Sequence, residues 1–181
     1  AEMAYTAQNY EKALENYKHL REQAATAERR QLAETGMLRS AAMLGNSEEL
    51  IFVTTSILSD AKVSPELENE ARYYRAKALT AVNQPQEAMS DWKLLSKDTR
   101  NVYGAEAKYR LAQGYFDGGQ IAESEAELLD YMNVSTPHAY WLARSFVLLS
   151  DVYVKMDRKL DARQYLLSLK QNYQAEDDIA T

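Results

Sequence analysis

The sequence of 181 residues contains no cysteine, only six glycines and three prolines, and two histidines. The absence of cysteine excludes disulfides, thiolate catalysis and cysteine-ligated zinc. It leaves the compartment open, because cytosolic and exported proteins alike can lack cysteine. Few glycines and prolines, beside many Ala, Leu, Glu, Gln, Lys and Arg, favour helices over strands and loops. An all-α protein is therefore expected.

Other missing features narrow the range of functions. The longest strongly apolar stretch, residues 146–149, is far shorter than the roughly 20 residues that cross a bilayer, so no membrane span is expected. A net charge of −6 provides no basic surface for phosphates, so nucleic acid is not an expected partner. HExxH motifs, phosphate loops and nucleophile elbows are absent, and His19 and His138 lie far apart. We therefore expect no catalytic residue, no metal site and no cofactor.

What the sequence does contain is a repeat. Five anchor positions, separated by 37, 38, 36 and 38 residues, set its register: Ala1, Leu38, Ala76, Ala112 and Ser150. Together with the residues three, twelve, sixteen and nineteen positions later, they make 25 positions, of which 22 are apolar. A 46% apolar composition would place about 11 or 12 apolar residues there by chance. The last three positions of each set have the i, i+4, i+7 spacing of a packed helix face, which predicts two helices per repeat.

Residues between these positions indicate where helices end and begin. Seven positions after each anchor stands a residue that mostly tolerates the left-handed conformation ending a helix: Gln8, Gly45, Asn83, Gly119 and Asp157. Ser64 and Thr136, each followed by proline, are typical N-caps at the start of a repeat. Asn46 with Glu49 is typical of a capping box. About ten helices in five antiparallel pairs are expected.

The repeats are expected to form one domain over residues 1–181. Their approximate ranges are 1–26, 27–62, 64–100, 102–134 and 136–173, with 174–181 as a frayed acidic tail. The first pair is expected to be incomplete, because Ala1 falls in the middle of a helix, as in a piece of a longer array. No amphipathic helix follows the last helix, which carries Leu166 and Leu169. The terminal apolar faces therefore either join two copies as a homodimer or mark where neighbouring repeats belong.

The order of small and large residues is most characteristic in residues 112–120 (AQGYFDGGQ) and 71–79 (ARYYRAKAL). In this order the chain resembles tetratricopeptide repeat (TPR) proteins over nearly its whole length. The second repeat departs most, since Leu38 and Leu50 stand at small-residue places. The resemblance implies a right-handed superhelical solenoid of helix pairs that binds a protein or peptide without a cofactor.

In a TPR stack, the first helix of each pair lines the concave surface through residues three before, one after and four after the anchor. The resemblance therefore implies a partner-binding groove lined by Arg39, Tyr73, Lys77, Tyr109, Gln113, Phe116 and Asp151. Tyr73, Tyr109 and Phe116 are candidate peptide anchors, because a groove facing water has no stability reason to carry three large rings. Packing of these rings against the adjacent first helix is the alternative. The Lys and Asn of the chaperone-tail clamp are absent from the matching positions.

Residues 135–144 resemble repeats of long TPR proteins from the cell envelope of Gram-negative bacteria, notably Bacteroidetes. This resemblance favours a periplasmic or envelope-associated location, and a cytoplasmic one stays open. Two functions are consistent with the sequence. One is a non-catalytic scaffold that holds a protein or peptide segment in the groove, and the other is a structural spacer or homo-oligomerisation segment of a longer envelope protein.

Overall fold

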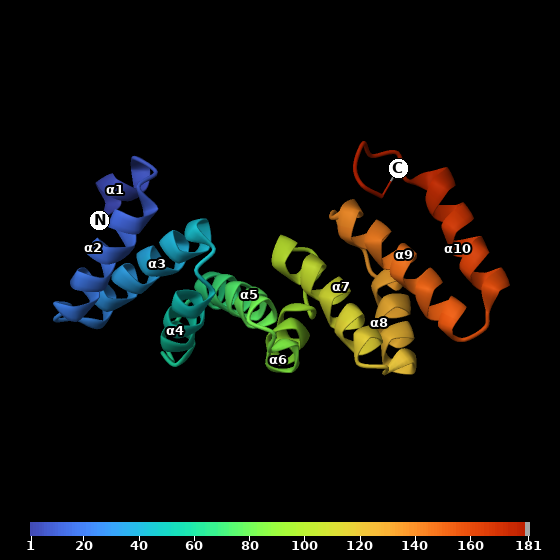
Figure 1. Ribbon diagram of the computed structural model, residues 1–181, viewed down its shortest axis with the longest axis horizontal. Coiled ribbons are helices and arrows are strands. Elements are labelled where there is room, and N and C mark those ends of the chain that lie inside the picture. Colours follow the sequence, from blue (N-terminus) through green and yellow to red (C-terminus); the bar gives the residue numbers. More distant parts are fainter. Residues whose placement is uncertain (180–181) are drawn as a thin grey trace. The chain divides into compact units, whose positions relative to one another are not determined.

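A computed structural model describes residues 1–179, and this part of the chain consists of ten α-helices without a strand (Figure 1). The predicted all-α class and the number of helices are confirmed. The chain divides into two compact units, Ala1–Asp91 and Trp92–Thr181, and each is described by itself. The arrangement of all the pairs as one solenoid over residues 1–181 stays a prediction.

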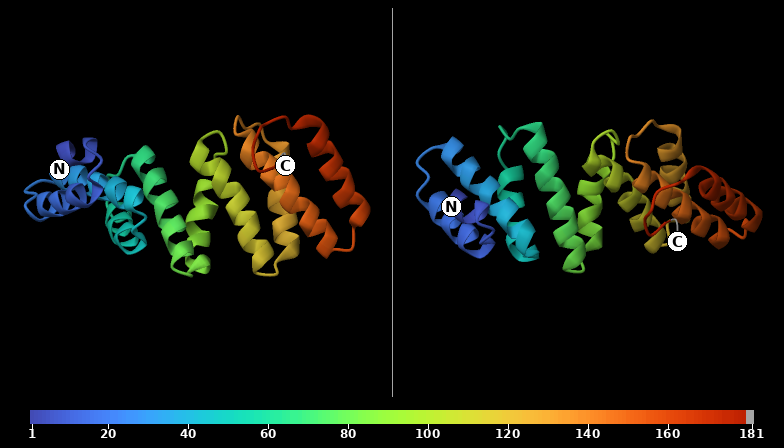
Figure 2. Two further views of the ribbon diagram at one scale, coloured as in Figure 1. Left: turned by 45° about the horizontal axis from the view of Figure 1, so that its top comes forward. Right: turned by 90° about the horizontal axis from the view of Figure 1, so that it is seen from above.

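In each unit, successive helices fold back on one another (Figure 2). The first unit holds α1 (Glu2–Thr6), α2 (Tyr10–Glu22), α3 (Ala27–Leu44), α4 (Ser47–Leu58) and α5 (Pro65–Ala81), and α6 (Pro85–Leu95) begins in it. The second unit holds the end of α6 with α7 (Val102–Asp117), α8 (Ile121–Asn133), α9 (Ala139–Lys155) and α10 (Lys159–Asn172). From α1 to α5 and from α7 to α10, each helix packs against the next, and α3 also contacts α5 as α7 contacts α9.

One turn recurs five times, between the two helices of every pair. Among the described residues, positive φ at non-glycine positions occurs only at Gln8 (59°), Asn83 (62°) and Asp157 (58°), and Gly45 (66°) and Gly119 (76°) share this conformation. The N–H of each of these residues donates to the carbonyl three residues earlier, at 2.9 to 3.2 Å. The next N–H donates to the carbonyl five residues earlier, at 2.8 to 3.0 Å. This is the Schellman motif, and it confirms the five predicted helix ends.

Some of the predicted N-caps are present in the structure, and one predicted capping box is only partly formed. Ser64 caps α5 as predicted, since its hydroxyl accepts a hydrogen bond from the Leu67 N–H at 3.3 Å. The Asn46 side chain caps α4 and accepts from the Glu49 N–H at 3.1 Å. The Glu49 carboxylate, however, pairs with Lys18 of α2 at 2.8 Å. The capping box is therefore formed on one side only.

The predicted N-cap at Thr136 is wrong. Helix α9 begins at Ala139 and has His138 at its N-cap position. The Thr136 hydroxyl donates to the Thr99 carbonyl at 2.8 Å and accepts from the His138 N–H at 3.2 Å. It therefore ties the segment before α9 to the segment after α6, a contact between residues that are distant in the sequence.

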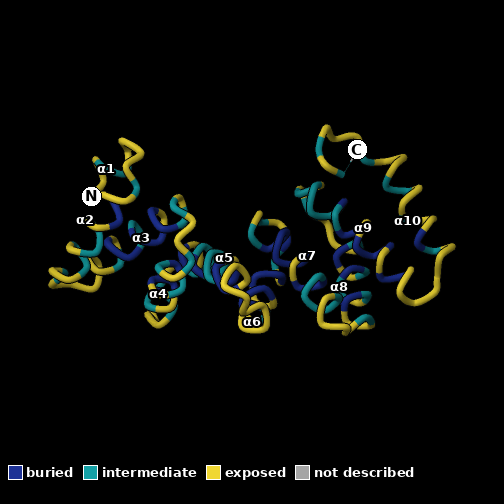
Figure 3. The backbone as a smooth tube through the Cα atoms, in the orientation of Figure 1, coloured by how far each residue is buried: buried dark blue, intermediate teal, exposed yellow. Residues whose placement is uncertain are grey.

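The repeat positions supply much of the core. All five residues twelve positions after an anchor are buried: Ala13, Leu50, Ala88, Ser124 and Ala162. Buried backbone, dark blue in Figure 3, follows the faces on which neighbouring helices of a unit meet. The repeat position Leu166 on α10 is 45% exposed. Among the helices of the second unit, α10 packs mainly against α9, and this leucine stays uncovered.

Two buried charges join helices within a pair. The fully buried Asp91 carboxylate accepts two hydrogen bonds from Arg75 at 2.7 Å and one from Arg72 at 3.1 Å. The Lys108 ammonium of α7 is bound by Glu127 and Asp130 of α8. Burial alone lowers the pKa of Lys108, but its hydrogen bonds to the two carboxylates outweigh this effect and raise the pKa. Each buried charge is therefore paired with opposite charges, as is usual for buried charges that stabilise a fold.

Candidate functional site

The seven predicted groove residues divide between the two units. Arg39 on α3 and Tyr73 and Lys77 on α5 belong to the first unit. The other four, Tyr109, Gln113 and Phe116 on α7 and Asp151 on α9, belong to the second.

In the first unit, the three predicted side chains contact residues of the same unit. Arg39 forms a two-point ion pair with the Glu70 carboxylate, with both nitrogen-to-oxygen distances at 3.0 Å. The Lys77 ammonium lies 5.0 Å from the centre of the Tyr73 ring and donates to the Tyr73 hydroxyl at 3.2 Å. Arg39 also lines a hollow of about 510 Å³ beside Tyr5 and Tyr17.

In the second unit, three of the four predicted residues meet at one hollow of about 320 Å³, which we call the α7–α9 hollow. Its lining residues are Tyr109, Gln113, Arg144, Val147, Leu148, Asp151, Asp178 and Ile179. The exception is Phe116, which packs half-buried against the core of this unit. The predicted groove positions on α7 and α9 thus converge because these two helices are in contact.

The α7 side of the hollow carries a short chain of hydrogen bonds. The Tyr109 hydroxyl donates to Gln113 Oε1 at 3.0 Å, and Gln113 Nε2 donates to Asp117 Oδ1 at 2.8 Å. These residues are four positions apart, so their side chains lie along one face of the helix. These hydrogen bonds orient the Gln113 amide beside the hollow.

The Tyr109 ring is more enclosed than a water-facing peptide anchor. It is 6% exposed, and its centre lies 5.6 Å from that of Trp141 on α9. The guanidinium groups of Arg110 and Arg144 lie 5.7 and 5.4 Å from the ring centre. The ring therefore packs against the next first helix, which is the alternative that the sequence left open.

Arg144 is the cation of the hollow, and the repeat positions did not single it out. Its Nη1 donates to the Tyr140 hydroxyl and to the Asp178 carboxylate, both at 2.9 Å. Hydrogen bonds with Tyr140 and Tyr109 raise the pKa of Arg144 despite partial burial, so the guanidinium stays charged. The sequence nevertheless contained an indication that Arg144 lies at this surface. Arg144 precedes Val147 by three residues, so it lies one turn away on the same helix face.

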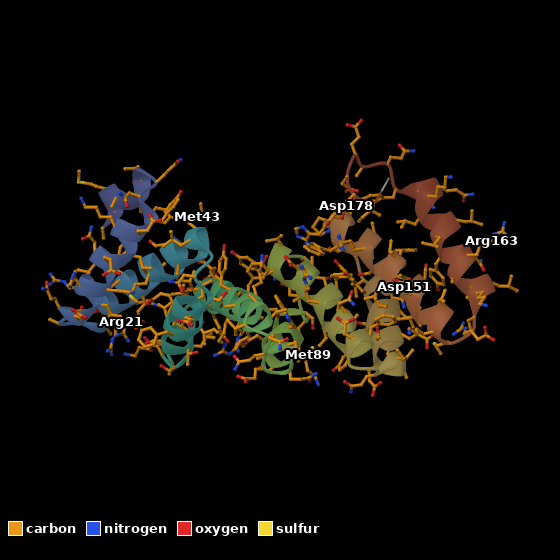
Figure 4. All side chains as sticks on the ribbon, viewed as in Figure 1. Arg21, Met43, Met89, Asp151, Arg163 and Asp178 are labelled. Atoms are coloured by element: carbon orange, nitrogen blue, oxygen red, sulfur yellow. The ribbon has the colours of Figure 1, made fainter. Side chains whose placement is uncertain are left out.

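The segment after α10 returns to this hollow. Residues 174–179, which belong to the expected frayed tail, are not helical, and residues 180–181 lie outside the described part. The segment is nonetheless held by contacts. The Tyr173 hydroxyl donates to Asp177, which also accepts from the Ile179 N–H at 3.0 Å. Figure 4 labels Asp178 in this segment and Asp151 on α9.

Comparisons of this chain with family models, with curated proteins and with solved structures found no match. Within residues 1–179, no group of three or more His, Asp or Glu side chains could hold a metal ion. No helix in this part of the chain has the length and apolar character needed to cross a membrane, in agreement with the expectation from the sequence.

Proposed function

We propose that the chain is a TPR-type right-handed solenoid that holds a protein or peptide segment, without catalysis, in a groove lined by the first helices of its pairs. The five Schellman turns at intervals of 36 to 38 residues support a true structural repeat. The contacts of α3 with α5 and of α7 with α9 support stacking of successive pairs. A periplasmic or envelope location remains an expectation from the family resemblance.

The observation that carries this proposal is that a non-helical segment forms part of the lining of the α7–α9 hollow. Asp178 and Ile179 line it, although they come from a non-helical segment beyond α10. Arg144 binds a carboxylate from this segment, and Val147 and Leu148 provide apolar surface beside it. A surface that accommodates an irregular segment of its own chain has the shape and chemistry to accept one from a partner.

Selection from a random displayed peptide library tests the proposal. We expect the whole chain to enrich peptides whose binding is lost, by at least about tenfold, when Val147→Trp fills the hollow. Val134→Trp is the matched control, because Val134 and Val147 are both 38% exposed but Val134 lies outside the hollow. Binding that survives both substitutions equally would place the site elsewhere, and failure to enrich any peptide would count against a peptide-binding function.

A second candidate function, a homo-oligomerisation or spacer segment, is favoured by the surface of α10. Leu160, Leu166 and Leu167 are 83%, 45% and 47% exposed. Beside them, Leu142 and Phe146 of α9 line an apolar hollow of about 380 Å³ together with Leu169. Apolar surface of this kind is typical of a face that packs against another helical surface.

A further inference from the structure

One face of α9 presents two opposite charges on either side of an apolar patch. Arg144, Val147, Leu148 and Asp151 all line the α7–α9 hollow. Asp151 follows Arg144 by seven positions, which at about 1.5 Å per residue is roughly 10 Å along the helix and nearly two full turns. The two charged side chains therefore emerge on the same face, with the valine and leucine between them.

The segment after α10 satisfies only one of these charges. Arg144 binds the Asp178 carboxylate at 2.9 Å, and Ile179 also lines the hollow. The exposed Asp151 has neither a hydrogen bond nor an ion pair with any residue in the described chain.

We propose, building on the peptide-binding function above, that the α7–α9 hollow recognises an extended peptide with an acidic residue, an aliphatic residue and, third after the acidic one, a basic residue. The carboxylate binds Arg144, the aliphatic side chain packs on Val147 and Leu148, and the cation binds Asp151. In the polyproline II conformation, residues i and i+3 lie on the same side, about 9 Å apart. This distance matches the spacing of the two charges on α9.

The chain's own segment imitates the first two elements of this ligand, so a ligand competes with it for Arg144. The side chains of Arg144 and Asp178 are 34% and 64% exposed. An ion pair with this exposure favours the bound segment by no more than about fivefold. A ligand that also pairs with Asp151 therefore competes successfully for the hollow.

Fluorescence anisotropy with capped, labelled peptides tests the charge pattern. The probe contains Asp-Ile-Ala-Lys between neutral residues, and two further peptides replace its Asp by Asn or its Lys by Glu. We expect the whole chain to bind the probe about tenfold more tightly than either altered peptide, with weaker binding at high salt. Equal affinity for all three would overturn the inference.

Substitutions in the protein assign each charge to its partner. Arg144→Gln should weaken binding of the probe about tenfold. The affinity for the Asn-containing peptide should not change. Asp151→Asn should weaken binding of the probe about tenfold without weakening binding of the Glu-containing peptide. This variant still tests the inference if Arg144→Gln disturbs folding, because Asp151 is exposed and forms neither a hydrogen bond nor an ion pair in the described chain. Arg163→Gln on α10 is the matched control for Arg144→Gln, since Arg163 is exposed and points away from α9 (Figure 4).

Displacement of the internal segment gives an independent readout. Asp178→Asn should tighten binding of the probe, by up to about fivefold, because the competing contact is weakened. Glu176→Gln removes the same charge from the same segment, and the Glu176 side chain contributes nothing to the hollow, so the affinity should not change. No effect of Asp178→Asn on affinity would overturn the competition.

The two proposals fail in different ways. Should library peptides bind the hollow without this charge pattern, the recognition rule is wrong and the peptide-binding function stands. Should neither the library nor the probe yield binding to the wild-type chain or to Asp178→Asn, both proposals are wrong.

Discussion

At the scale of single residues, close approaches of the backbone decide which side chains are tolerated. Gly104 lies in the first turn of α7, and its N–H donates to the Asn101 side chain at 2.8 Å. A Cβ atom at Gly104 would lie 2.0 Å from the Asp98 carbonyl oxygen and 2.7 Å from that of Leu95. Both obstacles are backbone atoms, which cannot rotate away. Helix propensity alone would favour alanine at this position by about 1 kcal/mol.

We therefore expect Gly104→Ala to lower the free energy of unfolding by about 3 kcal/mol, because overpacking against the backbone outweighs the gain in helix propensity. Chemical denaturation monitored by circular dichroism measures this change. Gly118→Ala serves as the control, because its φ is −78° and the nearest atom to its added Cβ is 3.2 Å away. A stabilised Gly104→Ala protein would contradict the packing described for this turn.

At the scale of helical elements, the repeated turn combines one favourable set of hydrogen bonds with different conformational costs. Gly119 adopts φ of 76° without a Cβ, whereas Asp157 adopts φ of 58° in the equivalent turn before α10. The left-handed conformation costs an L-residue roughly 1 to 2 kcal/mol, and less for aspartate, whose side chain bonds locally. The same geometry is therefore less stable wherever the glycine is missing.

Asp157→Gly should accordingly stabilise the second unit by about 0.5 to 1 kcal/mol, since the gain from removing the strained Cβ exceeds the entropy that glycine adds to the unfolded chain. The reverse change, Gly119→Ala, should destabilise it by about 1 kcal/mol, because no atom lies within 4 Å of the added Cβ and the cost is conformational alone. The denaturant concentration at the midpoint of unfolding should therefore rise for Asp157→Gly and fall for Gly119→Ala. Shifts of the same sign would show that the two turns are not equivalent.

At the scale of the whole molecule, the exposed leucines of α10 are the feature that burial within the chain does not explain. The homodimer hypothesis predicts that the mass measured by light scattering rises with protein concentration. The double substitution Leu166→Glu and Leu167→Glu should then restore the mass of one chain, because charges at an apolar interface are unfavourable. Val102→Glu is a control in the same unit, at a residue that is 51% exposed.

A mass of one chain at every concentration would contradict the homodimer. The leucine face would then be left for a neighbouring repeat or another partner. The measurement is independent of the peptide-binding tests, because Leu166 and Leu167 do not line the α7–α9 hollow.

The sequence by itself determined the features that depend on neighbours within one or two helical turns. The ten helices, the five left-handed residues and the five buried positions after them follow from steric limits on φ, from capping and from helical periodicity. Each of these causes acts locally, so it leaves a readable spacing in a single sequence.

The tertiary structure decided the contacts between distant residues. Arg144 meets Asp178 across 34 positions, and Thr136 bonds to Thr99 across 37 instead of capping α9. Packing of Trp141 on Tyr109 likewise encloses a ring that the resemblance to TPR proteins placed in the groove. No local spacing encodes these pairs, because their geometry depends on how helices pack and on where the segment after α10 turns back.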